Sequence, residues 1–283
     1  MNEIRLMESA EFPALLSEIP EPPLKLYVRG TIPSPESIFL AVVGSRKMSR
    51  YGKDACEYLI MGLADFPIVI VSGLALGIDA VAHKAALDAG LTTVAIPGSG
   101  LDDSVLYPRA NFRLAHEILN KGGALISEME PNESATPYSF PKRNRIMAGM
   151  CQATLIVEAD EKSGTLITAR LAVDYNRDLI VVPHSLFSDG GAGGHIFMKL
   201  GAKPVRKADD ILETLGIESG ATRKIISMNA DEEKVITLLA SPVSRDDLLR
   251  ELDMTISEAN VLLASMELRG LITESLGEVR KIS

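Results

Sequence analysis

The sequence has few residues that could hold a metal ion, form a disulfide or cross a membrane. Its 283 residues include two cysteines and four histidines, scattered with none at the spacing of metal ligands. Cys56 and Cys151 stand in apolar surroundings, which indicates reduced thiols in a cytosolic protein. No apolar run approaches the ~18 residues that span a bilayer, and the first residues do not resemble a signal peptide. We therefore expect a cytoplasmic protein without a metal site and without membrane association.

Three signatures of nucleotide and ester chemistry are also missing. The absence of G-x-x-x-x-G-K-[ST] excludes a P-loop NTPase. The absence of G-x-G-x-x-G with a later acidic residue excludes an ordinary dinucleotide site. Ser45, Ser72 and Ser99 lack the G-x-S-x-G frame of a nucleophile elbow. We therefore expect no nucleotide cofactor and no serine nucleophile of the elbow type.

The chain is acidic overall. It has 29 basic and 38 acidic residues, which give a formal net charge of −9. Because phosphate contacts need Lys and Arg, this sum argues against a nonspecific DNA binder. A basic patch can nevertheless exist within an acidic protein, so the local distribution of cations matters more than the sum.

From Phe39 onward, short apolar runs alternate with segments of helical spacing. These runs are apolar throughout, which is typical of strands covered on both faces. They occupy residues 39–44, 68–73, 92–98, 124–128, 154–159 and 179–184. Strands that alternate with helices predict an α/β fold with a Rossmann-like, doubly wound parallel sheet. Ligands of such sheets bind at the carboxyl ends of the strands.

The flanking segments have a different composition. Residues 1–38 contain six prolines and predict a short extended N-terminal arm, in which apolar residues near Leu26 could form an edge strand. We expect the Rossmann-like domain over 39–215, a linker over 216–230 and a second domain over 231–283.

The second domain has the pattern of a small C-terminal winged-helix domain. It has a helix from 231, a second that opens on Ser244, a third that opens on Ser257 and ends at Gly270, and a hairpin around Leu276-Gly277. The third helix carries Glu258 and Glu267 with only Arg269 as a cation. Since a recognition helix in a major groove is more basic, we interpret this domain as an interaction module.

Four predicted strand ends carry residues suited to binding an anion. At the first, Gly44-Ser45-Arg46 combines a tight turn, a hydroxyl and a planar cation. Ser72 stands at the second, Gly98-Ser99-Gly100 can expose successive amides at the third, and Ser163-Gly164-Thr165 begins a helix after the fifth. Each segment alone could also be an ordinary turn.

Other polar residues near these ends have structural explanations. Asp79 is placed to cap the helix over 79–90, and His83, one turn later, is expected to be a structural histidine. Tyr107 and Arg109 offer a ring and a cation, although they could equally belong to a structured loop.

The stretch 138–149, YSFPKRNRIMAG, concentrates cations and aromatic rings. No acidic residue interrupts it, and its polar and aromatic members are Tyr138, Phe140, Lys142, Arg143, Asn144 and Arg145. Cations hold phosphates while rings stack on bases, which is the chemistry of single-strand binding. The alternative is a solvated charged helix face, although such faces usually mix both signs.

Together these segments resemble the DNA-processing protein A family, also called Smf. The matching stretches are VVGSRKMSRYG (42–52), VSGLALGIDAVAHKAAL (71–87), VAIPGSGLDDSVLYPRAN (94–111), ISEMEP (126–131), FPKRNRIMAG (140–149) and SGTLITARLA (163–172). The resemblance implies a non-enzymatic protein that binds single-stranded DNA in a basic pocket, forms dimers and loads the RecA recombinase during natural transformation. It assigns DNA contacts to Arg46 and to 142–145, and it places Ser45, Ser72, Gly98 and Ser163 in the pocket lining.

The full set of candidate DNA-binding residues follows from both lines of reasoning. It comprises Ser45, Arg46, Ser72, Gly98, Ser99, Arg109, Lys142, Arg143, Asn144, Arg145 and Ser163. The chain departs from the family at His184, where Gly is usual, and at Gly194-His195, where Asn is expected second. Residues 1–38 are also too short for the helical domain that many members carry in front.

Two other functions remain open on the sequence alone. Nucleotide-processing enzymes of the lysine-decarboxylase-like class carry P-G-G-x-G-T-x-x-E, and here PGSGLDDS (97–104) lacks that frame although it includes Asp102 and Asp103. A signalling module that senses a free nucleotide is the third hypothesis.

Overall fold

The computed structural model divides the chain into two compact units, Met1–Ala221 and Thr222–Ser283. The residues that it describes are 3–34, 36–161, 163–217, 230–239, 241–252, 254–268, 271–275 and 277–281. Most of the predicted linker, 216–230, lies outside these residues, as do Arg269, Gly270 and Leu276.

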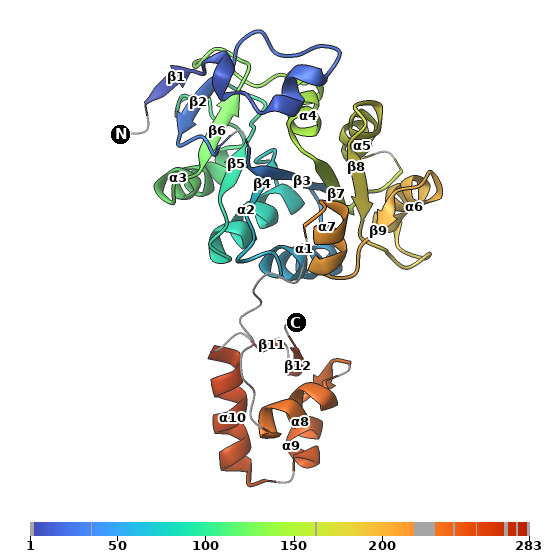
Figure 1. Ribbon diagram of the computed structural model, residues 1–283. Helices are drawn as coiled ribbons and strands as arrows, with labels where there is room; N and C mark the ends of the chain where they lie inside the picture. The colour runs from blue at the N-terminus through green and yellow to red at the C-terminus, as the bar shows by residue number, and fades with distance from the viewer. Residues whose placement is uncertain are drawn as a thin grey trace. The chain divides into compact units, whose positions relative to one another are not determined.

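A nine-stranded sheet forms the first unit, with strand order β1-β2-β6-β5-β4-β3-β7-β8-β9 (Figure 1). The strands from β6 to β9 in this order run parallel, whereas β1 and β2 are antiparallel to their neighbours. The strand bounds are β1 Ile4–Leu6, β2 Tyr27–Gly30, β3 Ile38–Gly44, β4 Ile68–Ser72, β5 Thr93–Ala95, β6 Ala124–Ser127, β7 Ala153–Glu158, β8 Asp178–Val181 and β9 Lys203–Pro204.

Helices cover both faces of this sheet, because its apolar strands present side chains to either side. In β7, Leu155 packs with α1, α2 and α7, while the adjacent Ile156 packs with α4, α5 and α6. The helix bounds are α1 Arg50–Met61, α2 Ile78–Asp88, α3 Phe112–Asn120, α4 Ser139–Met150, α5 Thr165–Asp174, α6 Ala192–Lys199 and α7 Ala208–Thr214. The predicted doubly wound fold is confirmed.

The third predicted strand is shorter than expected. β5 ends at Ala95 rather than continuing to residue 98. Beyond it, the Ile96 carbonyl accepts from the Arg143 guanidinium, and the Gly98 carbonyl accepts from the Ser139 hydroxyl at 2.5 Å. Side chains of α4 thus bond to two carbonyl groups beyond the end of β5, while the Ile96 amide still donates to the Ser72 carbonyl of β4.

The N-terminal segment is not an extended arm, contrary to the sequence prediction. Its strands β1 and β2 extend the sheet beyond β6, so Val28 lies in an inner strand rather than at the edge. Leu16 and Leu26 are buried in the main core. The six prolines fall outside both strands, which leaves the apolar residues between them free to pack.

The second unit is a winged-helix domain, as predicted. Its elements are α8 Ala230–Leu238, β10 Val243–Ser244, α9 Arg245–Glu251, α10 Ile256–Leu268, β11 Ile272–Ser275 and β12 Glu278–Lys281. The strands pair in the order β10-β12-β11. The Ser244 hydroxyl accepts from the Asp247 amide, so this serine caps α9 as expected. Among the described residues, no helix is long and apolar enough to cross a membrane.

The start of the third helix differs from the prediction. α10 begins at Ile256, and Thr255 rather than Ser257 caps it. The Thr255 hydroxyl accepts from the Glu258 amide at 3.3 Å, while the Glu258 carboxylate accepts from the Thr255 amide at 3.0 Å. This reciprocal capping box satisfies two backbone donors, which a cap at Ser257 would leave open.

Candidate nucleic-acid interface

A groove of about 760 Å³ opens at the carboxyl ends of the parallel strands. Four segments line it: the loop after β3, the start of α2, the first turns of α4 and the start of α5. Its cations are Arg46, Lys47 and Arg143, and its acids are Asp79 and Asp160. The groove lies where ligands of such sheets bind.

The loop after β3 presents two exposed cations to this groove. A Cβ at Gly44 would lie 2.6 Å from the Ile78 side chain, so only glycine fits where β3 ends. The Ser45 hydroxyl accepts from the Lys47 amide at 3.1 Å, and its carbonyl accepts from the Ile78 amide. Ser45 therefore shapes the turn, while Arg46 and Lys47 reach solvent.

The Phe140 ring forms an aromatic wall beside these cations. The Arg46 guanidinium lies 5.3 Å from the ring centroid, a cation–π distance. The centroid of the Tyr107 ring lies 5.8 Å from that of Phe140. A Cβ at Gly98 would come within 2.5 Å of the Phe140 ring, so Gly98 makes room for that ring.

Arg143 is the buried cation of the groove, with only 7% of its surface exposed. It donates to the Ile96 carbonyl, and its Nε has no hydrogen-bond partner among the described residues. A Cβ at Gly73 would lie 1.8 Å from its Nη1, so glycine is needed there. Burial lowers the pKa of Arg143 to about 10, against the attraction of Asp79, and the side chain remains a cation at neutral pH.

Asp79 does not cap α2, which corrects the sequence interpretation. The capping position is Gly77, and the buried Asp79 carboxylate accepts instead from the amides of Gly73 (3.1 Å) and Ala75 (3.4 Å). Burial raises the pKa of Asp79, while Arg143 opposes this rise. The carboxylate thus fixes the loop after β4 and faces the buried cation.

Side chains of the protein itself satisfy the helix starts at α1 and α5. The Glu158 carboxylate accepts from the Ser49 amide and hydroxyl, both at 2.9 Å, at the start of α1. At the start of α5 the Ser163 hydroxyl accepts from the Thr165 amide at 3.2 Å. Ser163 and Gly164 nevertheless line the groove, and a Cβ at Gly164 would meet nothing within 4 Å.

Three predicted site residues have their polar groups engaged inside the fold. The buried Ser72 hydroxyl donates to the Val42 carbonyl at 2.7 Å. The buried Ser99 hydroxyl donates to the Gly100 carbonyl and accepts from the Tyr107 amide. Ser163 remains partly exposed, and its hydroxyl donates to that of Thr165.

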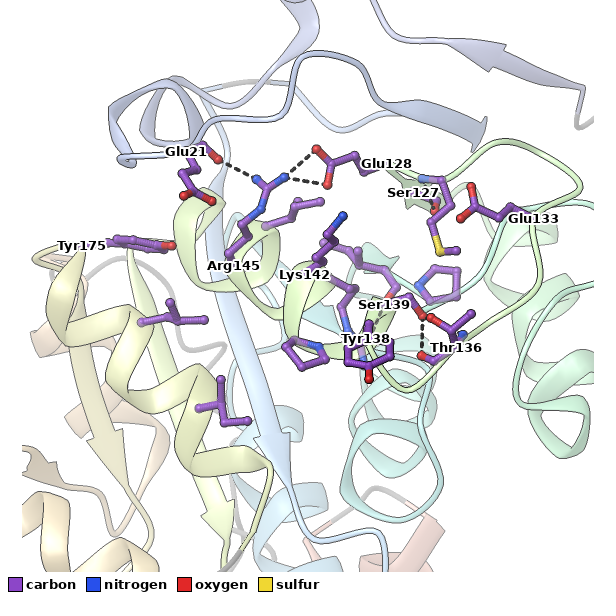
Figure 2. A pocket seen from close by; sticks show the side chains of 18 residues that line it. Glu21, Ser127, Glu128, Glu133, Thr136, Tyr138, Ser139, Lys142, Arg145 and Tyr175 are labelled. Carbon is purple, nitrogen blue, oxygen red and sulfur yellow. Dashed lines mark hydrogen bonds and ion pairs between the residues drawn. The ribbon is translucent and has the colours of Figure 1, made fainter.

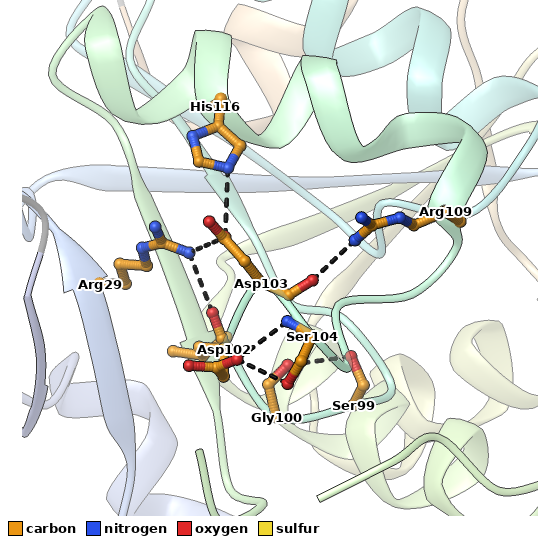
Figure 3. Close-up of polar contacts among 9 residues, drawn as sticks. Arg29, Ser99, Gly100, Asp102, Asp103, Ser104, Arg109 and His116 are labelled. Atoms are coloured by element: carbon orange, nitrogen blue, oxygen red, sulfur yellow. Dashed lines mark hydrogen bonds and ion pairs between the residues drawn. The ribbon is translucent and has the colours of Figure 1, made fainter. Parts of the chain in front are cut away.

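Arg109 belongs to a separate polar cluster on the loop after β5. Its Nη1 donates to the Asp103 carbonyl at 2.7 Å, and its guanidinium lies 4.3 Å from the Phe112 ring. The Asp103 carboxylate accepts from Arg29 (2.5 Å) and His116 (3.1 Å), as Figure 3 shows. Arg109 does not line the groove, and this cluster ties its loop to β2 and α3.

The four residues 142–145 do not form one basic patch. Successive helix residues turn by about 100°, so their side chains leave α4 in different directions. Arg145 binds both carboxylate oxygens of Glu128 at 2.5–2.6 Å and the Glu21 carbonyl (Figure 2). Asn144 lines the groove, and the exposed Lys142 lines a second cavity.

Two residues in or beside the groove, Lys47 and Glu158, were not among the predicted site residues. Lys47 follows Arg46 directly, so its place beside the predicted turn was an available signal. Glu158 is the lone charge near the end of the apolar run 154–159, which marks it as a residue near a strand end. Nothing in the sequence showed that its carboxylate would meet the start of α1.

The departures at His184 and His195 are accommodated by local contacts. His184 Nε2 donates to the Val157 carbonyl at 2.8 Å, and its ring lies edge-on to Tyr51 at 4.8 Å. His195 Nε2 donates to the His184 carbonyl at 3.1 Å. Both histidines therefore brace the loop after β8.

Family comparisons agree with this architecture. The sequence model of the family described as DNA recombination-mediator protein A matches residues 3–216, and that of the DprA winged helix domain matches residues 219–277. Protein Smf of Escherichia coli is 40% identical over 74% of this chain and 55% of its own length, so the chain spans about half of that relative. DNA processing protein DprA of Streptococcus pneumoniae is 41% identical over 71% of this chain and 70% of its own.

Solved structures are similar as well. DNA processing protein A from Streptococcus pneumoniae superposes with a TM-score of 0.69 at 38% identity, covering 75% of this chain and 74% of that one. The homologue from Helicobacter pylori, whose structure addresses its single-stranded DNA binding mode, gives a TM-score of 0.66 at 30% identity, with 76% and 98% coverage. This chain therefore belongs to the DNA recombination-mediator protein A family.

Proposed function

We propose that this protein binds single-stranded DNA in the groove and acts as a recombination mediator, not as an enzyme. The observation that carries the proposal is the cation–π contact of Arg46 with the Phe140 ring in a groove that buried Arg143 also lines. Cations that hold phosphates beside a ring that stacks on bases form a single-strand binding surface. The Helicobacter pylori relative, which binds single-stranded DNA, supports the same ligand here.

The blocked helix starts favour a polymer over a free nucleotide. In dinucleotide-binding folds, the phosphates sit at the helix that follows the first strand of the motif. Here the Glu158 carboxylate occupies the start of the corresponding helix, α1, and would repel a phosphate. The nucleotide-processing enzyme is therefore the weaker alternative.

Two partners complete the proposal. As a mediator, the protein would load the RecA recombinase on incoming DNA in natural transformation, and it would do so in the cytoplasm as a homodimer. The large apolar residues Leu186, Phe187 and Leu200 are 76–98% exposed, which supports an interface between copies. Sedimentation of the full chain measures its mass directly, and a pull-down with purified RecA tests the partner.

Binding to single- and double-stranded oligonucleotides across a salt series tests the function. Arg46→Glu should weaken single-strand binding at least about tenfold and lower the salt slope by about 0.7, since one phosphate contact is lost. The matched control is Lys53→Glu, an equal charge change on α1 outside the groove. Equal binding by Arg46→Glu and the parent would refute the site, and turnover of nucleoside monophosphates would refute the non-enzymatic assignment.

A further inference from the structure

A second cavity, of about 660 Å³, adjoins the groove across the first turn of α4. Figure 2 shows the side chains that line this cavity. It opens at the carboxyl ends of β5 and β6, between α4 and α5. Pro141, Arg143 and Ile167 line both the cavity and the groove. Pro141 and Ile167 are exposed, so they form an apolar boundary over which a nucleic-acid strand can pass from the groove into the cavity.

The rim of this cavity carries an aromatic ring that the fold does not use. Tyr138 is 83% exposed, and its side chain makes no capping bond although it precedes α4. Tyr175 forms another part of the wall, away from Tyr138 (Figure 2). Apolar residues such as Met129 and Leu171 also line this cavity. These surfaces suit flat apolar groups.

The charges of the cavity differ from those of the groove. Its cations are Lys142, Arg143 and Arg145, but Arg145 is neutralised by the Glu128 carboxylate. Glu21 and Glu133 add negative charge to the lining. Carboxylates repel phosphates, whereas they accept hydrogen bonds from the N–H groups of bases, the N3–H of thymine included. The exposed Lys142 is therefore suited to a phosphate at the rim, while the interior suits bases.

We propose that a single strand held in the groove continues over Pro141 and Ile167 into the second cavity, where a base stacks on Tyr138. This inference rests on the proposed function, because the groove must bind the same strand. It predicts a site longer than the groove, with phosphates held by Arg46 and Lys47 at one end and by Lys142 at the other.

Oligothymidylates of roughly 4 to 16 nucleotides, the span of common single-strand sites, test this path. The parent should gain affinity with length beyond the groove. Tyr138→Ala should lose about tenfold for the long oligonucleotides, the effect of one stacked base, and bind the short ones as the parent does. Tyr138→Phe, which keeps the ring, should behave as the parent, and the exposure of Tyr138 leaves the core intact in both variants.

A second experiment distinguishes contacts to the bases from contacts to the phosphate backbone. Long oligothymidylates with abasic residues in one half, placed at the 5′ or the 3′ end, keep every phosphate. One of these two abasic oligonucleotides should bind the parent protein with the same reduced affinity that the intact oligonucleotide shows for Tyr138→Ala. Equal effects of Tyr138→Ala at all lengths, or none at any length, would overturn the path and leave the cavity to a protein segment. Failure of the parent to bind any strand would instead overturn the proposed function.

Discussion

Arg46 and Arg143 are both cations of one groove, but they differ in what they do for the fold. Arg46 is exposed, and its guanidinium lies over the Phe140 ring at 5.3 Å from the centroid. Arg143 is buried, bonds to the Ile96 carbonyl and faces the Asp79 carboxylate. A buried charge that loses its partner is costly, whereas an exposed one is not.

We expect Arg143→Met to lower the free energy of unfolding by about 2–4 kcal/mol, because Asp79 and the Ile96 carbonyl lose a buried partner. Arg46→Met should change it by less than about 0.5 kcal/mol. Urea unfolding followed by circular dichroism compares the two variants. Equal midpoints for Arg143→Met and the parent would contradict the structural role of this guanidinium.

His83 should give the protein a measurable acid sensitivity. It is buried beside the Thr93 hydroxyl at 2.7 Å, and burial lowers its pKa from 6.5 to about 3. Below pH 6.5 the unfolded chain binds a proton that the folded chain does not, so stability falls as the pH drops toward 3. The slope contributed by His83 approaches about 1.4 kcal/mol per pH unit.

His83→Gln removes this titration. The difference in free energy of unfolding between pH 7 and pH 5 should therefore be smaller in the variant than in the parent. Identical pH slopes in both proteins would show that His83 titrates normally in the fold.

At the scale of elements, side chains of the protein itself satisfy several helix starts. Glu158 holds the start of α1, the Ser163 hydroxyl accepts from the Thr165 amide at the start of α5, and Thr255 with Glu258 closes α10. Asp79 lies in the first turn of α2 but bonds to the loop after β4 instead. Carboxylates of this acidic chain thus stabilise helix ends and the loop beside the groove.

The capping box of α10 yields a comparison of neighbouring residues. Thr255→Ala should destabilise the second unit by about 1 kcal/mol, because the Glu258 amide loses its acceptor. Ser257→Ala, two residues later, should leave stability nearly unchanged. Urea unfolding of the second unit, followed by amide NMR signals of α10, measures both; a larger effect at Ser257 would place the cap there after all.

For the whole molecule, every residue of the groove and of the second cavity lies in the first unit. The described exposed residues of α10 include Ile256, Glu258 and Val261, and none of them is Lys or Arg. The described surface of α10 therefore offers no cation to a phosphate.

A chain that ends at residue 217 should consequently bind single-stranded DNA within about threefold of the full chain. Fluorescence anisotropy with one labelled oligonucleotide at several salt concentrations compares the affinities of the shortened and the full chain. A loss beyond about tenfold, or a shallower salt slope, would assign DNA contacts to the second unit.

The sequence predicted the sheet and the winged helix well, because apolar runs are local signals, but it misplaced the caps of α2 and α10. It also led to the turn at Gly44-Ser45-Arg46. It could not show that Ser72 and Ser99 bond inward or that Arg145 pairs with Glu128, since these partners are distant in the chain. The N-terminal segment was misinterpreted because its prolines obscured two short strands.

Two glycines at neighbouring strand ends have a consequence for the variation that this chain can tolerate. Gly73 leaves the volume that the Arg143 guanidinium fills, and Gly98 leaves the volume that the Phe140 ring fills. Each glycine is therefore sterically matched to one side chain of α4, and the two residues of a pair can change only together. If a library with all substitutions at each position is selected for folded protein, alanine at either glycine should be among the rarest variants recovered. Folding of such a variant should be restored only by a smaller side chain at the matching position of α4.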